Sequence, residues 1–323
     1  MTHFSDPLLA SIASRLEDAD PGIRRVAVLD LVDSPEAEAV ELLIKALSDH
    51  DESVRMEAAK VIDEFEPRDM MDALVEALTS DDQNVRNAAA NALADLKDSN
   101  AAPALIAALK EDDPFVLASI LRSLKQLRIK DSRPHALRLL THTDPGVRRE
   151  AVSVLGYLQE ADNLPQLMSI AANDSDAEVR RTAIGALVYA DSDQVAKALI
   201  RGLSDEHWQV RVEAAKGLGR LNVESAIASL ITATTDSMWQ VQEKAAEALG
   251  KIGSTKAIEA LGACLENPIS NLRKAAVAAL GEIAHPDGMP LVEIALNDND
   301  PDVRKLARWA KEQIDAKSSA VGE

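Results

Sequence analysis

The histidines and the single cysteine are the side chains of this sequence that would most readily act in catalysis or bind a metal. No histidine is followed by glutamate, so the His-Glu-x-x-His pattern of helical zinc sites is missing. Cys264 lies in an apolar stretch, whereas a reactive thiol needs a positive or helix-start environment. Gly-rich phosphate loops and the Gly-x-Ser-x-Gly elbow are also missing. We therefore predict no catalytic residue, no metal site and no bound cofactor.

An arginine that returns at a fixed interval is the next candidate for chemistry. Successive positions are 31 residues apart, except for one step of 32, and eight of the ten keep Arg. The third residue after it is Ala in nine of the ten units. A fixed period of this length is typical of a solenoid, in which each unit buries its apolar face against its neighbours. We expect these arginines to bond acidic groups or turn carbonyls of neighbouring units, as a ladder. The ten anchor positions are Arg24, Arg55, Arg86, Leu117, Arg148, Arg180, Arg211, Gln242, Arg273 and Arg304.

Each unit contains two stretches with the apolar spacing of a helix, and the second begins at the anchor position. An acidic turn, often Asp-x-Asp, precedes the second helix, and its second Asp is expected to cap that helix. Gly219, Gly250 and Gly281 are expected to close second helices. The elements that carry any site are therefore pairs of helices.

The pattern Asp-x-x-Val-Arg-x-x-Ala-x-x-Ala-Leu-Gly resembles the HEAT-like repeats of the family named after phycobilisome lyases, over about residues 7–315. The resemblance implies an all-α fold, a right-handed α-solenoid of about ten 31-residue HEAT-like helix pairs. Residues 1–323 would form one continuous solenoid, with a flexible tail at 316–323. It also implies that the second helices line the concave surface. Some HEAT-repeat proteins are di-iron hydroxylases that use His-Glu pairs, and their absence here argues against that activity.

The two tyrosines of the chain occupy equivalent places in consecutive units, nine residues after the anchor position. Positions one, five and nine after the anchor share one face of a helix. At the ninth position the residues of successive units change from acidic through Gln126 to aromatic and then to basic, and the first position is Arg in both Tyr-bearing units. Tyr and Arg are frequent anchors of binding surfaces, so we predict a partner-binding groove. The alternative is surface variation in which the tyrosines cover apolar edges. The predicted groove residues are Arg149, Tyr157, Arg181, Tyr189, Lys216, Arg220 and Lys251.

Two further irregularities accompany this face. The fourth unit is rich in basic residues from Arg122 to Arg138, which either balances the acidic units before it or extends the basic groove. Trp208 and Trp239 stand where other units place Pro at the first position of the second helix. We predict that these indoles are a contact site on the rim, and the alternative is that they fill the ridge between turns.

The charge of the chain limits the kinds of partner it can take. Its 54 acidic and 35 basic residues give a net charge of −19, which disfavours nucleic acid and anionic membranes. One cysteine, no secretory signal and no apolar run long enough to span a bilayer favour a cytoplasmic protein. We predict a non-catalytic scaffold that binds a partner protein in its concave groove. The alternative, implied by the resemblance, is a bilin lyase-like or tetrapyrrole-handling protein.

Overall fold

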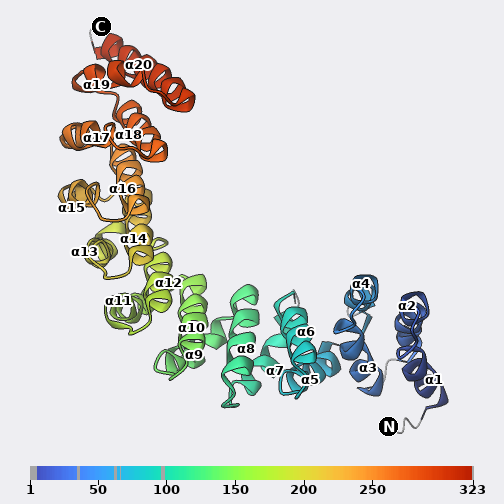
Figure 1. Cartoon of the computed structure of the whole chain (residues 1–323). Coiled ribbons are helices and arrows are strands. Elements are labelled where there is room, and N and C mark those ends of the chain that lie inside the picture. The colour runs from blue at the N-terminus through green and yellow to red at the C-terminus, as the bar shows by residue number, and fades with distance from the viewer. Residues whose placement is uncertain (1–5, 35–36, 62–63, 66, 96–98, 322–323) are drawn as a thin grey trace. The chain divides into compact units, whose positions relative to one another are not determined.

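A computed structural model describes residues 6–34, 37–61, 64–65, 67–95 and 99–321 (Figure 1). Helices account for 78% of it, and the described residues contain no strand. The predicted all-α solenoid is therefore confirmed. The chain divides into two compact units, Met1–Leu158 and Gln159–Glu323, and each is described by itself.

The unit Met1–Leu158 consists of helix pairs arranged as two layers (Figure 1). The first helices of its pairs are α1 (Pro7–Arg15), α3 (Ala37–Leu47), α5 (Pro67–Ala77), α7 (Ala102–Ala108) and α9 (Arg133–Leu139). The second helices are α2 (Pro21–Asp30), α4 (Glu52–Val61), α6 (Gln83–Ala94), α8 (Pro114–Leu127) and α10 (Pro145–Leu158).

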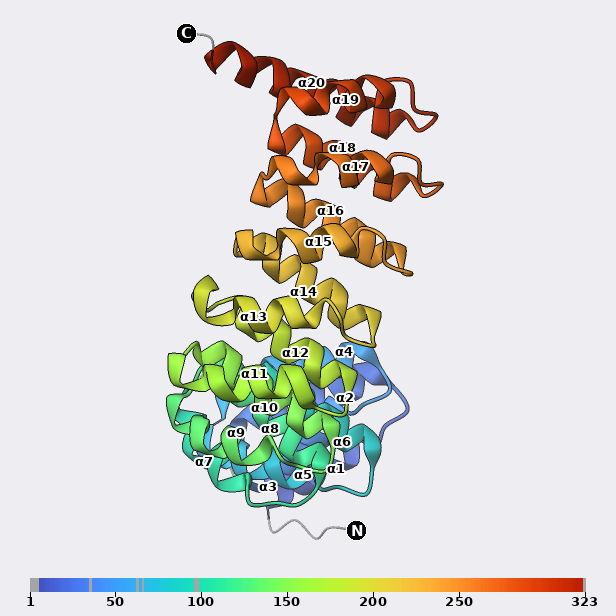
Figure 2. The same ribbon diagram turned by 90° about the vertical axis from the view of Figure 1, so that its left-hand side faces the viewer.

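The unit Gln159–Glu323 repeats this layering, and its first helices stack one above another in Figure 2. They are α11 (Leu164–Asn173), α13 (Ser192–Gly202), α15 (Ile227–Ala233), α17 (Ile258–Cys264) and α19 (Met289–Ala295). The second helices are α12 (Ala177–Leu187), α14 (Trp208–Arg220), α16 (Trp239–Ile252), α18 (Ser270–Ile283) and α20 (Pro301–Val321).

The acidic turns cap the second helices as predicted. Asp51 accepts a hydrogen bond from the N–H of Ser53 at 2.8 Å, and Asp176 accepts from Glu178 and Val179 at 2.9 and 3.0 Å. These bonds satisfy backbone donors that the first turn of a helix leaves without partners. Where this Asp is present, the capping bond defines the residue at which the second helix begins, whereas α14, α16 and α18 have no such side-chain cap.

The core between the layers is made of small and branched apolar side chains. The Ala three residues after the anchor position is completely buried in every unit that has one, as at Ala27, Ala151 and Ala276. A residue this small allows neighbouring helices to approach closely. This column of alanines therefore lies inside the solenoid.

The glycines near the ends of second helices have a different role from the one expected. Helices α14, α16 and α18 continue past Gly219, Gly250 and Gly281 and end later. A Cβ atom added to Gly219 would lie 2.8 Å from the Ala248 Cα, which is closer than carbon atoms pack. These glycines therefore permit contact between consecutive second helices, and the helix-ending glycine is Gly253, with φ +73°.

The last helix is longer than the sequence pattern predicted. Helix α20 extends through Val321, so residues 316–321 are helical where a flexible tail was expected. Ile314 is buried in this helix, and the Lys317 ammonium donates to the Ile283 carbonyl at 3.0 Å. Packing against the preceding pair thus holds the helix beyond the end of the repeat pattern. Among the described residues, no helix combines the length and the apolar character needed to cross a membrane.

Candidate functional site

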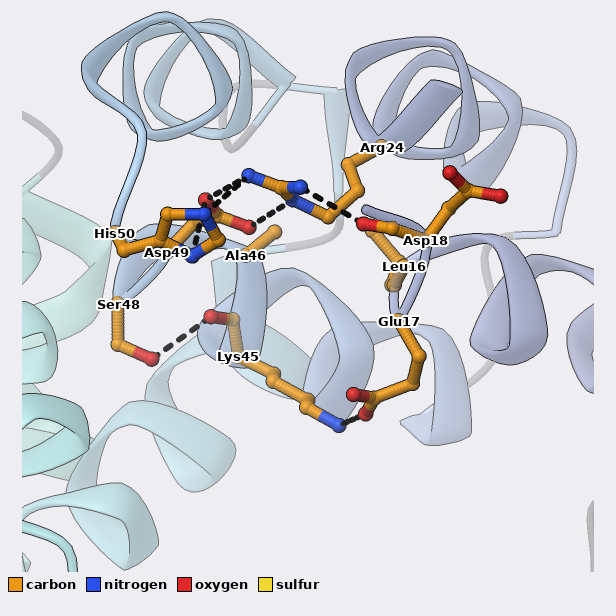
Figure 3. A pocket seen from close by; sticks show the side chains of 9 residues that line it. All are labelled: Leu16, Glu17, Asp18, Arg24, Lys45, Ala46, Ser48, Asp49 and His50. Atoms are coloured by element: carbon orange, nitrogen blue, oxygen red, sulfur yellow. Dashed lines mark hydrogen bonds and ion pairs between the residues drawn. The ribbon is translucent and has the colours of Figure 1, made fainter. Parts of the chain in front are cut away.

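The anchor arginines form the predicted ladder. Arg24 is only 2% exposed, and its Nε and Nη2 donate to the Asp49 carboxylate at 2.8 and 2.9 Å (Figure 3). Its Nη1 donates to the carbonyl of Asp18 at 2.8 Å. One guanidinium thus closes its own turn and binds the turn of the next pair, which uses its planar set of donors fully.

The same bidentate arrangement recurs in the unit Gln159–Glu323. The Nε of the anchor arginine lies 2.7–2.8 Å from the aspartate 25 residues later. In the other unit Arg86 pairs instead with the helix-capping carboxylate of Asp113, at 3.0 and 3.1 Å. The recurring pairs are Arg180–Asp205, Arg211–Asp236 and Arg273–Asp298.

Where an anchor is not arginine, its acidic partner has changed as well. Leu117 replaces one anchor, and the place 25 residues later is His142. Gln242 replaces another, and the equivalent place is Asn267. His142 and Asn267 still accept the N–H two residues later, at 3.0 Å each, as the aspartates do. The turn geometry is thus kept while the charge of both partners is removed.

The ion pairs set the protonation of the ladder. The hydrogen bond from Arg273 holds the pKa of Asp298 below its usual value, against a smaller upward effect of burial. Burial alone would raise the pKa of Asp205, but the bonds from Arg180 and from the His207 N–H bring it below its usual value. These aspartates are therefore ionised at neutral pH.

Shallow recesses beside the ladder are part of the scaffold. One of about 280 Å³ is lined by Arg24, Asp49, Lys45 and neighbouring residues (Figure 3). A second, of about 440 Å³, lies at the equivalent place beside Arg180 and Asp205. Because both recesses surround ladder pairs, they follow from the stacking of repeats and do not single out a ligand site.

A cationic group on helices α8 and α10 is a stronger candidate. We call Arg122, Lys125, Arg128, Arg149, Glu150 and Tyr157 the α8–α10 cluster. Glu150 is 5% exposed, with one carboxylate oxygen 3.3 Å from Arg122 Nη2 and the other 3.4 Å from Lys125 Nζ. Arg149 Nη2 lies 3.6 Å from the same carboxylate. One acid thus stands among three cations.

Tyr157 completes this cluster. Its side chain is 45% exposed, and the charged atoms of Lys125 and Arg128 lie 5.7 and 5.9 Å from the ring centroid. Cations at this distance are attracted by the electron-rich ring face. The predicted groove residues Arg149 and Tyr157 therefore belong to one cluster, together with basic residues of the fourth unit. The sequence interpretation missed Glu150, which lies two residues after its anchor and outside the columns that we compared.

The remaining predicted groove residues lie on second helices of the other unit, except Tyr189, which lies in the turn that follows α12. Tyr189 is 56% exposed, and the Arg220 guanidinium stands 4.7 Å from its ring centroid. Arg181 donates to the Glu178 carboxylate at 2.5 and 3.0 Å, and Lys216 lies 3.6 Å from Glu213. The pairing of Tyr189 with Arg220, each nine residues after its anchor, agrees with the column register of the repeats.

Lys251 follows Arg220 in the same column and is exposed. Its ammonium lowers the pKa of the neighbouring Glu282, although burial dominates and raises that pKa overall. Acidic partners thus accompany several cations of this unit, which makes its surface less positive than the α8–α10 cluster.

The two rim tryptophans occupy the predicted helix starts. Trp208 and Trp239 are the first residues of α14 and α16, and both are half-buried. Their N-caps, His207 and Met238, make no side-chain capping bond. The earlier Asp205 does not cap the helix in their place, because it accepts from the His207 N–H and from Arg180.

Comparisons with known proteins agree with this architecture. A family model described as HEAT repeats matches residues 9–69, 53–125, 102–187, 164–239, 196–270 and 227–312. No curated protein matches the sequence significantly.

The chain is similar in fold to solved importin-β-type structures. Importin beta shares 14% identity at a TM-score of 0.61, with 96% of this chain and 51% of that chain covered. A second match is Kap95p, whose binding induces the switch loops of RanGDP to adopt the GTP-bound conformation. It shares 15% identity at a TM-score of 0.60, with 95% of this chain and 48% of that chain covered. Kap95 in complex with Nup1 also shares 15% identity at a TM-score of 0.60, with 97% of this chain and 52% of that chain covered. This chain spans about half the length of these structures, and the likeness is one of fold.

Proposed function

Because the chain belongs to the HEAT-repeat family, we propose that it is a non-catalytic scaffold that binds a partner protein along its second helices. The observation that carries the proposal is the pair of exposed tyrosines, Tyr157 and Tyr189, each with a cation over its ring. Aromatic and arginine side chains are enriched at the centres of protein interfaces. The similar fold of Kap95p, a protein that binds RanGDP, supports the same class of function.

The proposed binding surface comprises the groove residues predicted from the sequence. The unit Met1–Leu158 contributes Arg149 and Tyr157 to this surface. The unit Gln159–Glu323 contributes Arg181, Tyr189, Lys216, Arg220 and Lys251. Each unit would contact the partner through its own residues. We propose Trp208 and Trp239 as additional contacts, because an indole at the start of a helix offers apolar surface and an N–H donor.

A charge reversal on this surface tests the proposal. The tagged chain would be used to capture partners from its native lysate, in parallel with the double variant Arg149→Glu with Arg181→Glu. We expect the variant to lose the partners that the unaltered chain retains, because like charges across an interface repel. Circular dichroism would check that both proteins are equally helical.

The matched control reverses two exposed lysines away from the second helices. Lys110→Glu with Lys197→Glu changes the net charge by the same amount, and both lysines are exposed near first helices. The control should keep its partners. If both double variants lose them equally, or neither does, the second-helix surface is not the binding site. An absorption titration with a bilin tests the tetrapyrrole alternative in the same preparations, and a spectral shift abolished only by the first variant would favour it.

A further inference from the structure

We propose that the α8–α10 cluster is the docking site of an acidic linear segment of the partner, and that Glu150 is an internal competitor for the same cations. The inference rests on the proposed function and gives the chemistry of the partner. It depends on three features of the cluster, which are its charge, the way Glu150 is held and the environment of Tyr157.

The cluster reverses the charge of the chain locally. Arg122, Lys125 and Arg149 face the Glu150 carboxylate and Arg128 stands beside the Tyr157 ring, while the whole chain carries a net charge of −19. An excess of positive charge at one place on an acidic protein attracts a negative ligand to that place.

Glu150 uses only part of the donor capacity around it. Its contacts, at 3.3–3.6 Å, are longer than the 2.7–2.9 Å usual for charged hydrogen bonds. The side chains of Arg122 and Arg149 are 42% and 41% exposed, and each guanidinium carries five N–H donors. A carboxylate arriving from solvent therefore has access to these partly exposed side chains, and it draws on the same cations that Glu150 now holds.

Tyr157 gives the site an apolar component. Its ring is half-exposed, and the charged ends of Lys125 and Arg128 lie 5.7 and 5.9 Å from the ring centroid. The aliphatic part of a glutamate, or an apolar residue beside one, could pack on this ring while the carboxylate reaches the cations. A ring inside a cationic cluster thus suits a peptide better than a simple inorganic anion.

The surroundings favour a short segment over a long polyanion. The preceding units place acids nine residues after their anchors, at Asp33 and Asp95, which are exposed on second helices or at their ends. A nucleic acid or an anionic membrane that extended along the preceding helix pairs would meet this negative charge, whereas a short acidic peptide need not. We therefore identify the ligand as an acidic protein segment.

The test measures binding of a short, fluorescein-labelled, glutamate-rich peptide to the full chain by fluorescence anisotropy at low salt. The variant Arg122→Glu with Arg128→Glu should weaken binding by about tenfold or more, since two attractions become repulsions. Glu150→Gln should tighten binding severalfold, because it removes the internal competitor and keeps the shape of the side chain. Thermal unfolding followed by circular dichroism would verify that each variant is folded.

Glu17→Gln is the matched control, because it also removes one carboxylate that pairs with a cation, Lys45, outside the proposed binding surface. It should leave peptide affinity unchanged. The inference is overturned if the unaltered chain does not bind the peptide, or if Glu150→Gln and Glu17→Gln have equal effects. It is also overturned if single-stranded DNA or anionic vesicles bind the cluster more tightly than the peptide. Should the Glu150→Gln protein not fold, the arginine variant decides alone.

Failure of this inference is distinguishable from failure of the scaffold function. If lysate partners depend on Arg149 and Arg181 but the acidic peptide does not bind, the scaffold proposal stands and the acidic segment is wrong. If the peptide binds as described and no partner is captured, the cluster stands and the scaffold proposal loses its support.

Discussion

At the scale of single residues, the Arg180–Asp205 pair shows what the ladder contributes. Both side chains are nearly buried, and Asp205 also accepts the His207 N–H. Asp205→Ala removes the acceptor and leaves the guanidinium without its main counter-charge. We expect a loss of about 3 kcal/mol in the free energy of unfolding, as is typical for breaking one side of a buried ion pair.

Denaturant unfolding followed by circular dichroism would measure this loss. Arg201→Ala is the control, because that arginine is exposed in α13 and its contact with the Ala172 carbonyl is long, at 3.5 Å. It should change stability by less than about 0.5 kcal/mol. Equal losses in the two variants would mean that the ladder adds no more than an ordinary surface charge.

The ladder arginines could be predicted from the sequence because they recur at a fixed period of 31 residues, whereas Glu150 could not. Its column contains Val26, Ala88 and Thr182 as well as acids, so no repeat pattern marks it. Its environment depends on Arg122 and Lys125 from the preceding pair, which meet it only once α8 and α10 are packed.

At the scale of elements, the contact between α14 and α16 depends on a residue without a side chain. Gly219→Ala would place its new methyl group 2.9 Å from the Ala248 Cβ and 2.8 Å from the Ala248 Cα. We expect a loss of about 1–3 kcal/mol through overpacking, although Ala favours the helix over Gly.

Gly185→Ala in α12 is the matched substitution for this test. The nearest atom to its added Cβ is a Glu213 carboxylate oxygen at 3.5 Å, an ordinary contact. There the helical preference for Ala should dominate and stabilise the protein by about 0.5–1 kcal/mol. Thermal melts of the two variants should therefore shift in opposite directions, and shifts of the same sign would contradict this account of the glycines.

The positions of the helices could be predicted from the sequence, but how closely neighbouring helices approach could not. Pro114, Pro145 and Pro301 begin second helices as expected, because proline fits only at the start of a helix. A glycine near a helix end, in contrast, suits either a left-handed cap or a close approach. Only the packed position of Ala248 decides between them for Gly219.

At the scale of the whole molecule, the ladder makes the free energy of unfolding depend on pH in the acidic range. The ladder aspartates have folded pKa values below the unfolded value of about 3.9. Their contribution is therefore complete above that unfolded value and is lost as the pH falls through the folded pKa values. Glu282 acts in the opposite direction, because burial raises its pKa and its protonation favours the folded chain.

Since several aspartates oppose one glutamate, the midpoint of urea unfolding should fall steeply below about pH 4. A flat profile between pH 5 and pH 3 would show that the ladder is not a net source of stability.

The net charge of −19 predicts a separate response to salt. Mutual repulsion of surface carboxylates destabilises the compact chain and is screened at about 0.1 M salt, while buried pairs are screened much less. We expect the melting temperature at neutral pH to rise between low salt and about 0.2 M sodium chloride. The rise should shrink near pH 4.5, where carboxylates begin to protonate. A fall in melting temperature at neutral pH would instead show that exposed ion pairs outweigh the repulsion.

The ladder also gives the growing chain an order of assembly. In Arg180–Asp205 and Arg273–Asp298 the donor precedes its acceptor by 25 residues, and the next first helix lies between them. During synthesis an anchor arginine therefore leaves the ribosome before the carboxylate that will hold it. Each pair can close only after the following repeat has begun to emerge. The ladder pairs of the nascent chain therefore form in order from the N-terminus, each about one repeat behind the residue being synthesised.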